Sequence, residues 1–242
     1  MSAGEAPGRA AAEPFFPTPS SRRWALAYGA WAAAAVAASV ALGGLSPENL
    51  TRLTVIAFLG VQWAWRGRLV NALPGWAPRT RFVVLGTTLA ALVEGFHMIS
   101  RPVFDGLRVT AQTPPLQAVG HYVADLAFTV PAYLVILSLI WWFVNRWRYS
   151  PWTYAIVFGL AQALGDGGLV YFAGQPAMLA FLPYPVTNYH AMNVLPYLAV
   201  VGSLDPDRTA GPARWLAIPA VIGTYFACGA LIRWAGMPFG LA

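Results

Sequence analysis

The stretch from Ala118 to Asn145 reads AVGHYVADLAFTVPAYLVILSLIWWFVN, and Asp125 is its only Asp, Glu, Lys or Arg residue. This run exceeds the ~20 apolar residues that an α-helix needs to span a bilayer. The whole chain has the same character, because 58% of its 242 residues are hydrophobic and 10% are charged. Soluble domains average about 25% charged residues. The sequence therefore predicts an all-α, polytopic integral membrane protein.

Seven spans are expected within a single transmembrane helical domain at 23–242. It follows a disordered cytoplasmic tail at 1–22 that is rich in Ala, Pro, Ser and Gly. The second span is the weakest, because only a short run separates Arg52 from Arg66. In the fifth span, the helix is expected to loosen at Gly165-Asp166-Gly167-Gly168. The expected spans are 24–43, 53–72, 82–100, 118–145, 151–173, 186–203 and 213–235.

The basic residues indicate the orientation of these spans. All are arginines, since the chain contains no lysine, and the formal net charge is +6. Cytoplasmic loops carry an excess of basic residues. With the N-terminus inside, the outer side holds four arginines, namely Arg52, Arg101, Arg108 and Arg233. The cytoplasmic side then holds eleven, namely Arg9, Arg22, Arg23, Arg66, Arg68, Arg79, Arg81, Arg146, Arg148, Arg208 and Arg214. This bias predicts an N-in/C-out protein whose arginines report topology and not nucleic-acid binding.

Three acids and three histidines lie within the expected spans. They are Glu94, Asp125, Asp166, His97, His121 and His190. On the ~1.5 Å rise per helical residue, all six fall in the outer half of the membrane. Four pairs share helical faces: Glu94 with His97, His121 with Asp125, Gln162 with Asp166, and His190 with Asn193. Ionisable groups at membrane depth usually face a bundle interior or a wet cavity, so one polar chamber is expected. Simple interhelical hydrogen bonding is the alternative for any single residue.

Three chemistries could use such a chamber. In proton transfer, buried carboxyl groups protonate and deprotonate an apolar substrate. In metal chemistry, Glu94-x-x-His97 would supply two ligands as in di-iron bundles, with His121, Asp125 and His190 completing the site. In transport, the same residues would form a proton or cation path. Only one Glu-x-x-His is present where a di-iron pair needs two, and no internal repeat of the kind typical of transporters is found.

Aromatic residues accompany the polar ones. Phe96, Tyr133 and Tyr171 lie along or beside the same spans. Aromatic faces stabilise positive charge, which suits a substrate that passes through a carbocation. We therefore predict that these three residues, with the amides of Gln162 and Asn193, bind the substrate.

Short motifs over residues 85–203 resemble the emopamil-binding-protein (EXPERA) family. Val93-Glu94-Gly95-Phe96 resembles its Ile-Glu-Gly-aromatic motif, and Gln162-Ala163-Leu164-Gly165-Asp166 with Leu169-Val170-Tyr171-Phe172 resembles its Gly-Gln-x-x-Gly-Asp-x-x-Tyr-Phe stretch. Tyr184-Pro185 and Met192-Asn193-Val194-Leu195 are similar to its His-Pro and Met-Asn-x-Leu-Trp motifs. The enzymes of that family isomerise a sterol double bond, and other members bind sterols or lipophilic amines.

The resemblance implies an acid/base role for Glu94, a polar contact from Asn193 and a polar helix residue at Asp166. Three departures accompany it: Ala90 stands where the family has a histidine, Pro196 replaces an aromatic residue, and the second catalytic glutamate falls near Tyr133.

The sequence thus predicts a membrane enzyme that acts on an isoprenoid, sterol-like or related lipid by proton transfer, as an isomerase or cyclase. Glu94 is the predicted proton donor, and Asp166 or Asp125 is the second acid/base group. His97, His121 and His190 would tune or relay the proton. The expected partners are a hydrophobic small molecule and the bilayer, and no cofactor is predicted. The alternatives are a lipophile-binding or transport protein and a non-haem metal oxygenase.

Overall fold

The computed structural model describes residues 15–71 and 75–241, and every regular element in these residues is helical. The all-α prediction is confirmed. The long helices are α1 (Pro19–Gly43), α2 (Pro47–Val70), α3 (Pro78–His97), α4 (Pro115–Arg146), α5 (Pro151–Ala163), α7 (Pro183–Val200) and α8 (Ala217–Gly236). Between α5 and α7 the chain forms a π-helical turn, η2 (Leu164–Gly168), then α6 (Leu169–Gly174) and a 3₁₀ segment, η3 (Pro176–Phe181). Shorter 3₁₀ turns are η1 (Asp105–Leu107), η4 (Val201–Ser203), η5 (Pro212–Leu216) and η6 (Met237–Phe239).

Proline marks the start of most long helices. A proline occupies the first turn of α1, α2, α3, α4, α5 and α7, where its missing N–H is no loss. Hydroxyl caps precede three of these prolines. The side chains of Thr18, Ser46 and Ser150 each accept a hydrogen bond from the backbone N–H three residues later. Capping and proline together set the helix starts from local sequence.

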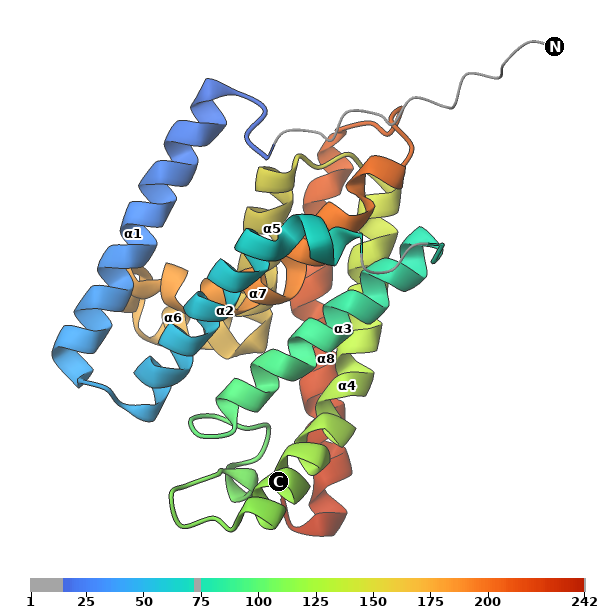
Figure 1. The fold of residues 1–242 in the computed structure, drawn as a ribbon. Helices are drawn as coiled ribbons and strands as arrows, with labels where there is room; N and C mark the ends of the chain where they lie inside the picture. Colours follow the sequence, from blue (N-terminus) through green and yellow to red (C-terminus); the bar gives the residue numbers. More distant parts are fainter. Residues whose placement is uncertain (1–14, 72–74, 242) are drawn as a thin grey trace.

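Helix α7 lies at the centre of the bundle (Figure 1). Fifteen of its 18 residues are buried, and it packs against α1, α2, α3 and α5. Helices α3, α4 and α8 form the adjoining side, since α4 contacts both α3 and α8, while α5 bridges α7 and α8. This arrangement places α3, α4, α5, α7 and α8 around one interior region.

Four helical segments are long and apolar enough to cross a membrane: Pro19–Gly43, Pro115–Arg146, Pro151–Gly174 and Pro212–Phe239. These correspond to four of the seven expected spans. Helices α2, α3 and α7 form where three more were expected. They are not among the helices apolar enough to cross a membrane, although α2, with 24 residues, is as long as Pro151–Gly174. Their sequences explain why, because α2 carries four ionisable residues, α3 begins among arginines, and α7 contains asparagines, a histidine and three prolines.

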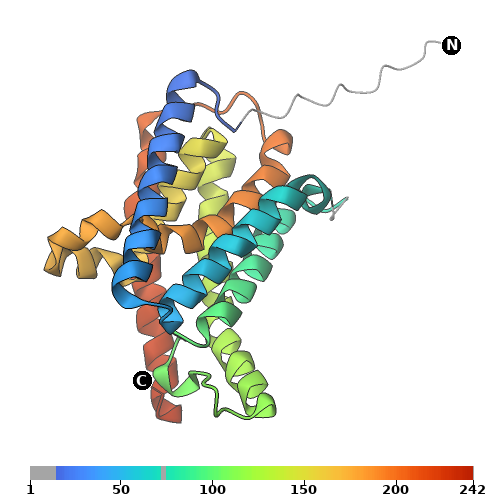
Figure 2. The same cartoon turned by 60° about the vertical axis from the view of Figure 1, so that its left-hand side comes forward.

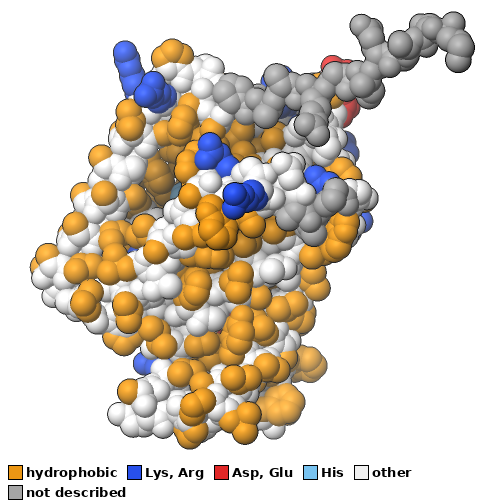
Figure 3. All heavy atoms as spheres, in the orientation of Figure 1, with side chains coloured by type: hydrophobic (Ala, Val, Ile, Leu, Met, Phe, Trp, Pro, Cys, Tyr) orange, Lys and Arg blue, Asp and Glu red, His pale blue; other side chains and the backbone are white. Residues whose placement is uncertain are grey.

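Two expected boundaries are wrong. Helix α1 begins at Pro19, inside the expected tail; residues 1–14 of that tail lie outside the described residues. Helix α2 begins at Pro47 and not at residue 53, so Arg52 lies within the helix and not in a connection. Most of the arginine side chains on the face in Figure 3 gather at the end where α1 begins and α2 ends.

The sides of the bundle are apolar. Trp24, Leu116, Val123 and Leu231 are each at least 60% exposed, and hydrophobic side chains cover much of the face in Figure 3. Soluble monomers rarely expose such large contiguous apolar surfaces. Figure 2 shows that α6 and η3 project sideways from the bundle after the π-helical turn.

Candidate functional site: a polar cluster inside the bundle

Seven polar side chains from six neighbouring elements, α3, α4, α5, η2, α7 and α8, meet inside the bundle. We call them the central cluster. Three hydrogen-bonded groups make it up, and electrostatic interactions connect their ionisable members. The members are Glu94, Tyr133, Gln162, Asp166, Tyr189, Asn193 and Tyr225.

The first group joins α3 to α4. The hydroxyl of Tyr133 donates a hydrogen bond to Oε1 of Glu94, and both side chains are partly exposed. Glu94 also interacts electrostatically with Asp125 and Asp166. One oxygen of Glu94 is thus fixed by a phenol, and the carboxyl group interacts with other acids.

The second group forms at the π-helical turn η2. Asp166 has a non-helical ψ of 37°, and Gly167 adopts a φ of 90°, a conformation that glycine tolerates far better than other residues. This break leaves Asp166 exposed and directs its Oδ2 to the hydroxyl of Tyr189, which donates to it at 2.6 Å. The expected loosening at Gly165–Gly168 is confirmed, and π-bulges often occur at functional sites.

The third group is fully buried and joins α5, α7 and α8. Nε2 of Gln162 donates to the Tyr225 hydroxyl oxygen at 3.0 Å, and Nδ2 of Asn193 donates to Oε1 of Gln162. Gln162 and Asn193 are both 0% exposed. Since Tyr225 accepts in this contact, its own proton is free to be donated elsewhere. The Tyr225 ring packs edge-to-face against Tyr189, with centroids 6.2 Å apart.

Asp125 lies beside the cluster but serves the loop after α3. It is 0% exposed, and its Oδ1 accepts from the backbone N–H of Val103 at 2.7 Å. Its backbone carbonyl accepts from the Thr129 hydroxyl at 3.0 Å. Asp125 is therefore tied to the loop and reaches Glu94 only electrostatically.

The three histidines lie in three separate environments, so the expectation of one chamber for all six ionisable residues is wrong. Nε2 of His97 pairs with Nδ2 of Asn188 at 2.9 Å. His121 lies against the loop carbonyl of Leu107 at 3.1 Å. His190 pairs with the Tyr28 hydroxyl at 2.9 Å, between α7 and α1. The direction in which each histidine side chain points depends on how its helix is rotated about the helix axis. The spacing of residues along a single helix does not reveal that rotation.

The alternative metal site loses its geometry for the same reason. The side chains expected as ligands have different partners; they are Glu94, His97, His121, Asp125 and His190. The described part of the chain contains no group of three His, Cys, Asp or Glu side chains that could hold a metal ion. Two predicted aromatic contacts also lie apart from the cluster. Phe96 packs on Phe58 with centroids 5.4 Å apart, and Tyr171 is 46% exposed on α6.

Sequence reasoning missed Tyr189 and Tyr225 as site residues. Both are tyrosines in the middle of helices, whereas most membrane tyrosines lie at the interfaces. That position is the signal that could have singled them out.

Arg52 is the third residue that was missed. It is 6% exposed. Its Nη1 donates to Oδ1 of Asn188 and, at 3.3 Å, to the hydroxyl of Thr187. Its guanidinium lies 4.3 Å from the ring centroid of Tyr184. The same Asn188 contacts His97, so a polar chain runs from α2 through α7 to α3.

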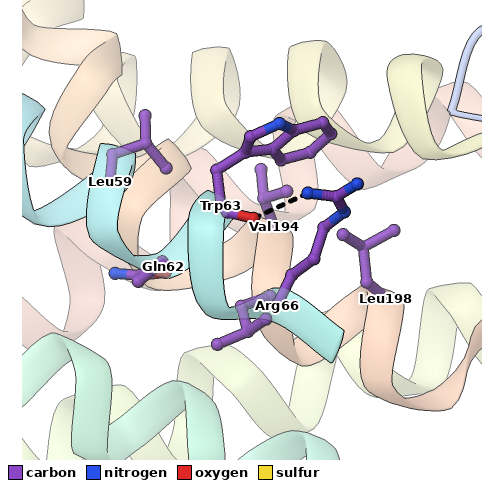
Figure 4. A pocket seen from close by; sticks show the side chains of 7 residues that line it. Leu59, Gln62, Trp63, Arg66, Val194 and Leu198 are labelled. Carbon is purple, nitrogen blue, oxygen red and sulfur yellow. Dashed lines mark hydrogen bonds between the residues drawn. The ribbon is translucent and has the colours of Figure 1, made fainter. Parts of the chain in front are cut away.

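A small hollow lies between α2 and α7 on the side of Trp63 and Arg66 (Figure 4). The guanidinium of Arg66 covers the Trp63 ring at 4.6 Å and donates to its carbonyl at 2.7 Å. Leu59, Val194 and Leu198 complete the lining. Its volume of about 10 Å³ would hold a single water, so this hollow is too small for a lipid ligand.

Comparison of the chain with family models, with curated proteins and with solved structures finds no match. The likeness to the EXPERA family therefore stays a prediction that rests on its motifs.

Proposed function

We propose that the protein is an integral membrane enzyme that acts on an apolar isoprenoid or sterol-like lipid by proton transfer, as a double-bond isomerase or a cyclase. The observation that carries the proposal is the pair of phenol-bound carboxyl groups in the central cluster. Glu94 is held by Tyr133 and Asp166 by Tyr189, and the two acids interact electrostatically. Acid–base catalysis on an alkene needs one group that gives a proton and another that takes one.

In the proposed reaction, the carboxylic acid of Glu94 adds its proton to one alkene carbon, and the neighbouring carbon becomes cationic. The Asp166 carboxylate then removes a proton from a different carbon, which restores a double bond at a new position or after ring closure. The substrate gains one proton and loses one, so product and substrate are isomers. No cofactor is needed.

The aromatic members of the cluster suit this intermediate. The rings of Tyr133, Tyr189 and Tyr225 interact electrostatically with both acids. Their π-faces attract a cation, and the apolar walls of α4, α5 and α8 exclude water that would otherwise quench it. The EXPERA-like motifs around Glu94, Asp166 and Asn193 support the same assignment.

We further propose that the chain crosses the membrane seven times, N-in/C-out, with α2, α3 and α7 as the three less apolar spans. Burial supports this, because α7 is enclosed by other helices and need not face lipid. The arginine bias of eleven to four supports the orientation. The substrate would enter from the bilayer.

The test uses proton exchange, so it requires no knowledge of the product. Purified protein in vesicles is incubated in D₂O with an isoprenoid and sterol extract, and lipids that gain deuterium are detected by mass spectrometry. The expected result is deuterium uptake by one lipid class, reduced ~10²–10⁴-fold in Glu94→Gln. Glu48→Gln, which alters an exposed acid in the first turn of α2, is the matched control and should retain the wild-type rate.

Two outcomes would contradict the proposal. A wild-type protein that binds lipids but never introduces deuterium would be a binding or transport protein. Activity that requires a stoichiometric metal, lost on chelation, would indicate metal chemistry instead.

A further inference from the structure

Arg52 is a buried cation whose hydrogen-bond and ring contacts are all to neutral groups. The side chains against its guanidinium are an amide, a hydroxyl and an aromatic ring, contributed by Asn188, Thr187 and Tyr184. Among the described residues the only ion pair joins Arg108 to Asp105. Glu48, one helical turn before Arg52, is exposed and forms no ion pair with it. The buried guanidinium of Arg52 therefore has no negative partner in the described part of the chain. Burying a charge without a counter-ion is costly.

The side of the guanidinium that carries the unpaired Nε defines what that partner could be. Both contacts to α7 use Nη1, whereas Nε is buried and has no hydrogen-bond partner in the described part of the chain. Nε and Nη2 form one edge of the planar fork. Two parallel N–H groups on such an edge match the two oxygens of a carboxylate or phosphate.

Asn188 holds this edge in place. Its Oδ1 accepts from Arg52, and its Nδ2 lies 2.9 Å from Nε2 of His97. Since an amide nitrogen only donates, Nε2 of His97 accepts in this contact. Both hydrogen bonds of the chain Arg52–Asn188–His97 are therefore donated towards His97. They hold the arginine between α2, α7 and α3.

The Arg52 site lies close to the central cluster. His97 follows Glu94 by three residues, a rise of ~4.5 Å along α3. Arg101, exposed just beyond α3, interacts electrostatically with both His97 and Asp166. Positive charge thus collects at this end of α3, and the acids of the cluster lie about one turn deeper.

We propose that Arg52 binds the anionic headgroup, a phosphate or carboxylate, of an amphiphilic isoprenoid whose reactive carbons lie about one helical turn deeper, at Glu94. This assignment of the substrate class rests on the proposed lipid function. The substrate of this class has a charged head close to the carbons that exchange protons. Its apolar tail extends into the bundle or the bilayer.

The test compares three probes that share either a head or a tail. Binding of farnesyl phosphate, farnesol and inorganic phosphate to the full chain in neutral detergent is measured by tryptophan fluorescence or calorimetry. The wild type is expected to bind farnesyl phosphate at least tenfold more tightly than farnesol, and Arg52→Gln to bring that ratio below twofold. Arg108→Gln, which removes an exposed arginine of the loop after α3, is the matched control and should keep the full preference.

Equal affinity of the wild type for farnesyl phosphate and farnesol would overturn the proposal, and so would a full preference in Arg52→Gln. Inorganic phosphate that binds as tightly as farnesyl phosphate would identify a site for a free anion, and the headgroup assignment would fail.

A second variant keeps the test decisive if Arg52→Gln does not fold. Asn188→Asp is nearly isosteric and supplies Arg52 with a carboxylate inside the protein. It should fold, and it should lower the preference for farnesyl phosphate at least tenfold because the internal acid occupies the arginine. An unchanged preference in this variant would show that Arg52 only joins α2 to α7.

The binding test is independent of catalysis. Glu94→Gln should keep the wild-type preference for farnesyl phosphate even though it loses deuterium exchange. If the headgroup assignment fails, exchange by the wild type still supports the proposed function; if exchange fails, an Arg52-dependent preference still supports the anion site.

Discussion

Tyr133 gives Glu94 a defined direction. Its hydroxyl donates to Oε1 of the carboxyl group, which fixes one of the two carboxyl oxygens. A tyrosine can also return a proton to a carboxylate through the same hydrogen bond. At the scale of single residues, this contact fixes the position of the Glu94 carboxyl group. An isolated polar side chain on an apolar helix would have no such contact.

We therefore predict that Tyr133→Phe lowers the rate of deuterium exchange about tenfold, because a hydrogen bond to a charged group contributes ~1.5–3 kcal/mol. The rate is measured as deuterium uptake under single-turnover conditions. Tyr149→Phe is the control, since Tyr149 lies in the connection between α4 and α5 and its hydroxyl donates to the carbonyl of Arg214 at 2.7 Å, outside the cluster. A wild-type rate in Tyr133→Phe would remove Tyr133 from the mechanism.

Some residues of the site could be predicted from the sequence, and others could not. Glu94, Asp166, Gln162 and Asn193 stand out because polar groups in apolar runs are rare. Arg52 was assigned to a connection because its helix was expected to start after it, although Ser46-Pro47 ahead of it is a helix-start signal. The contacts of the histidines depend on tertiary packing, which spacing along a single helix does not determine.

At the scale of elements, the π-helical turn η2 is the feature that opens the bundle at Asp166. Its glycines allow a path that other residues resist, and Gly167 is the only member with a positive φ. The Gly-Asp-Gly-Gly run made this break predictable from sequence. The path of the chain after it, where α6 and η3 project sideways, was not predictable because it depends on the packing of η3 against α1 and α7.

Gly167→Ala should destabilise the protein by about 1–2 kcal/mol, since a side chain at a φ of 90° is strained as in left-handed helical conformations. It should also slow deuterium exchange by displacing Asp166. Thermal unfolding in detergent gives the first effect and the exchange assay the second. Gly174→Ala, at the end of α6 with open space around it, is expected to leave both unchanged. Equal effects of the two substitutions would argue against a strained turn.

Close packing of α5 on α7 depends on a second glycine. A Cβ at Gly159 would lie 2.7 Å from Cε1 of His190 and 3.2 Å from Cγ1 of Val186. Gly159→Ala should therefore cost about 1–3 kcal/mol through overpacking and break the contact between His190 and Tyr28. Unfolding in detergent measures the cost. Gly60→Ala on α2, with nothing within 4 Å, should instead stabilise its helix by up to about 1 kcal/mol, and a loss of stability there would point to a general intolerance of alanine.

At the scale of the whole molecule, the fold class followed from composition alone, whereas the number of spans did not. A helix in a bilayer must be apolar on the face that contacts lipid, whereas a helix enclosed by others can carry asparagines, a histidine and prolines on every side, as α7 does. Hydropathy therefore identifies α1, α4, α5 with α6, and α8, and a helix with many polar residues, such as α7, is not recognised by it.

Reporter fusions at three positions distinguish seven crossings from four. If α2, α3 and α7 also cross the membrane, reporters ahead of α1 and in the connection between α2 and α3 are both cytoplasmic, and one after Ala242 is outside. If only the four apolar segments cross, the connection is outside and both ends are cytoplasmic. The arginines at the α2–α3 connection, Arg66, Arg68, Arg79 and Arg81, favour the first pattern because translocating them opposes the positive-inside bias. A phosphatase active only outside the cytoplasm, paired with a fluorescent protein that folds only inside, makes every position give one positive signal. A cytoplasmic reporter after Ala242 would contradict the seven-span topology, and the central cluster would then have to be placed in the membrane anew.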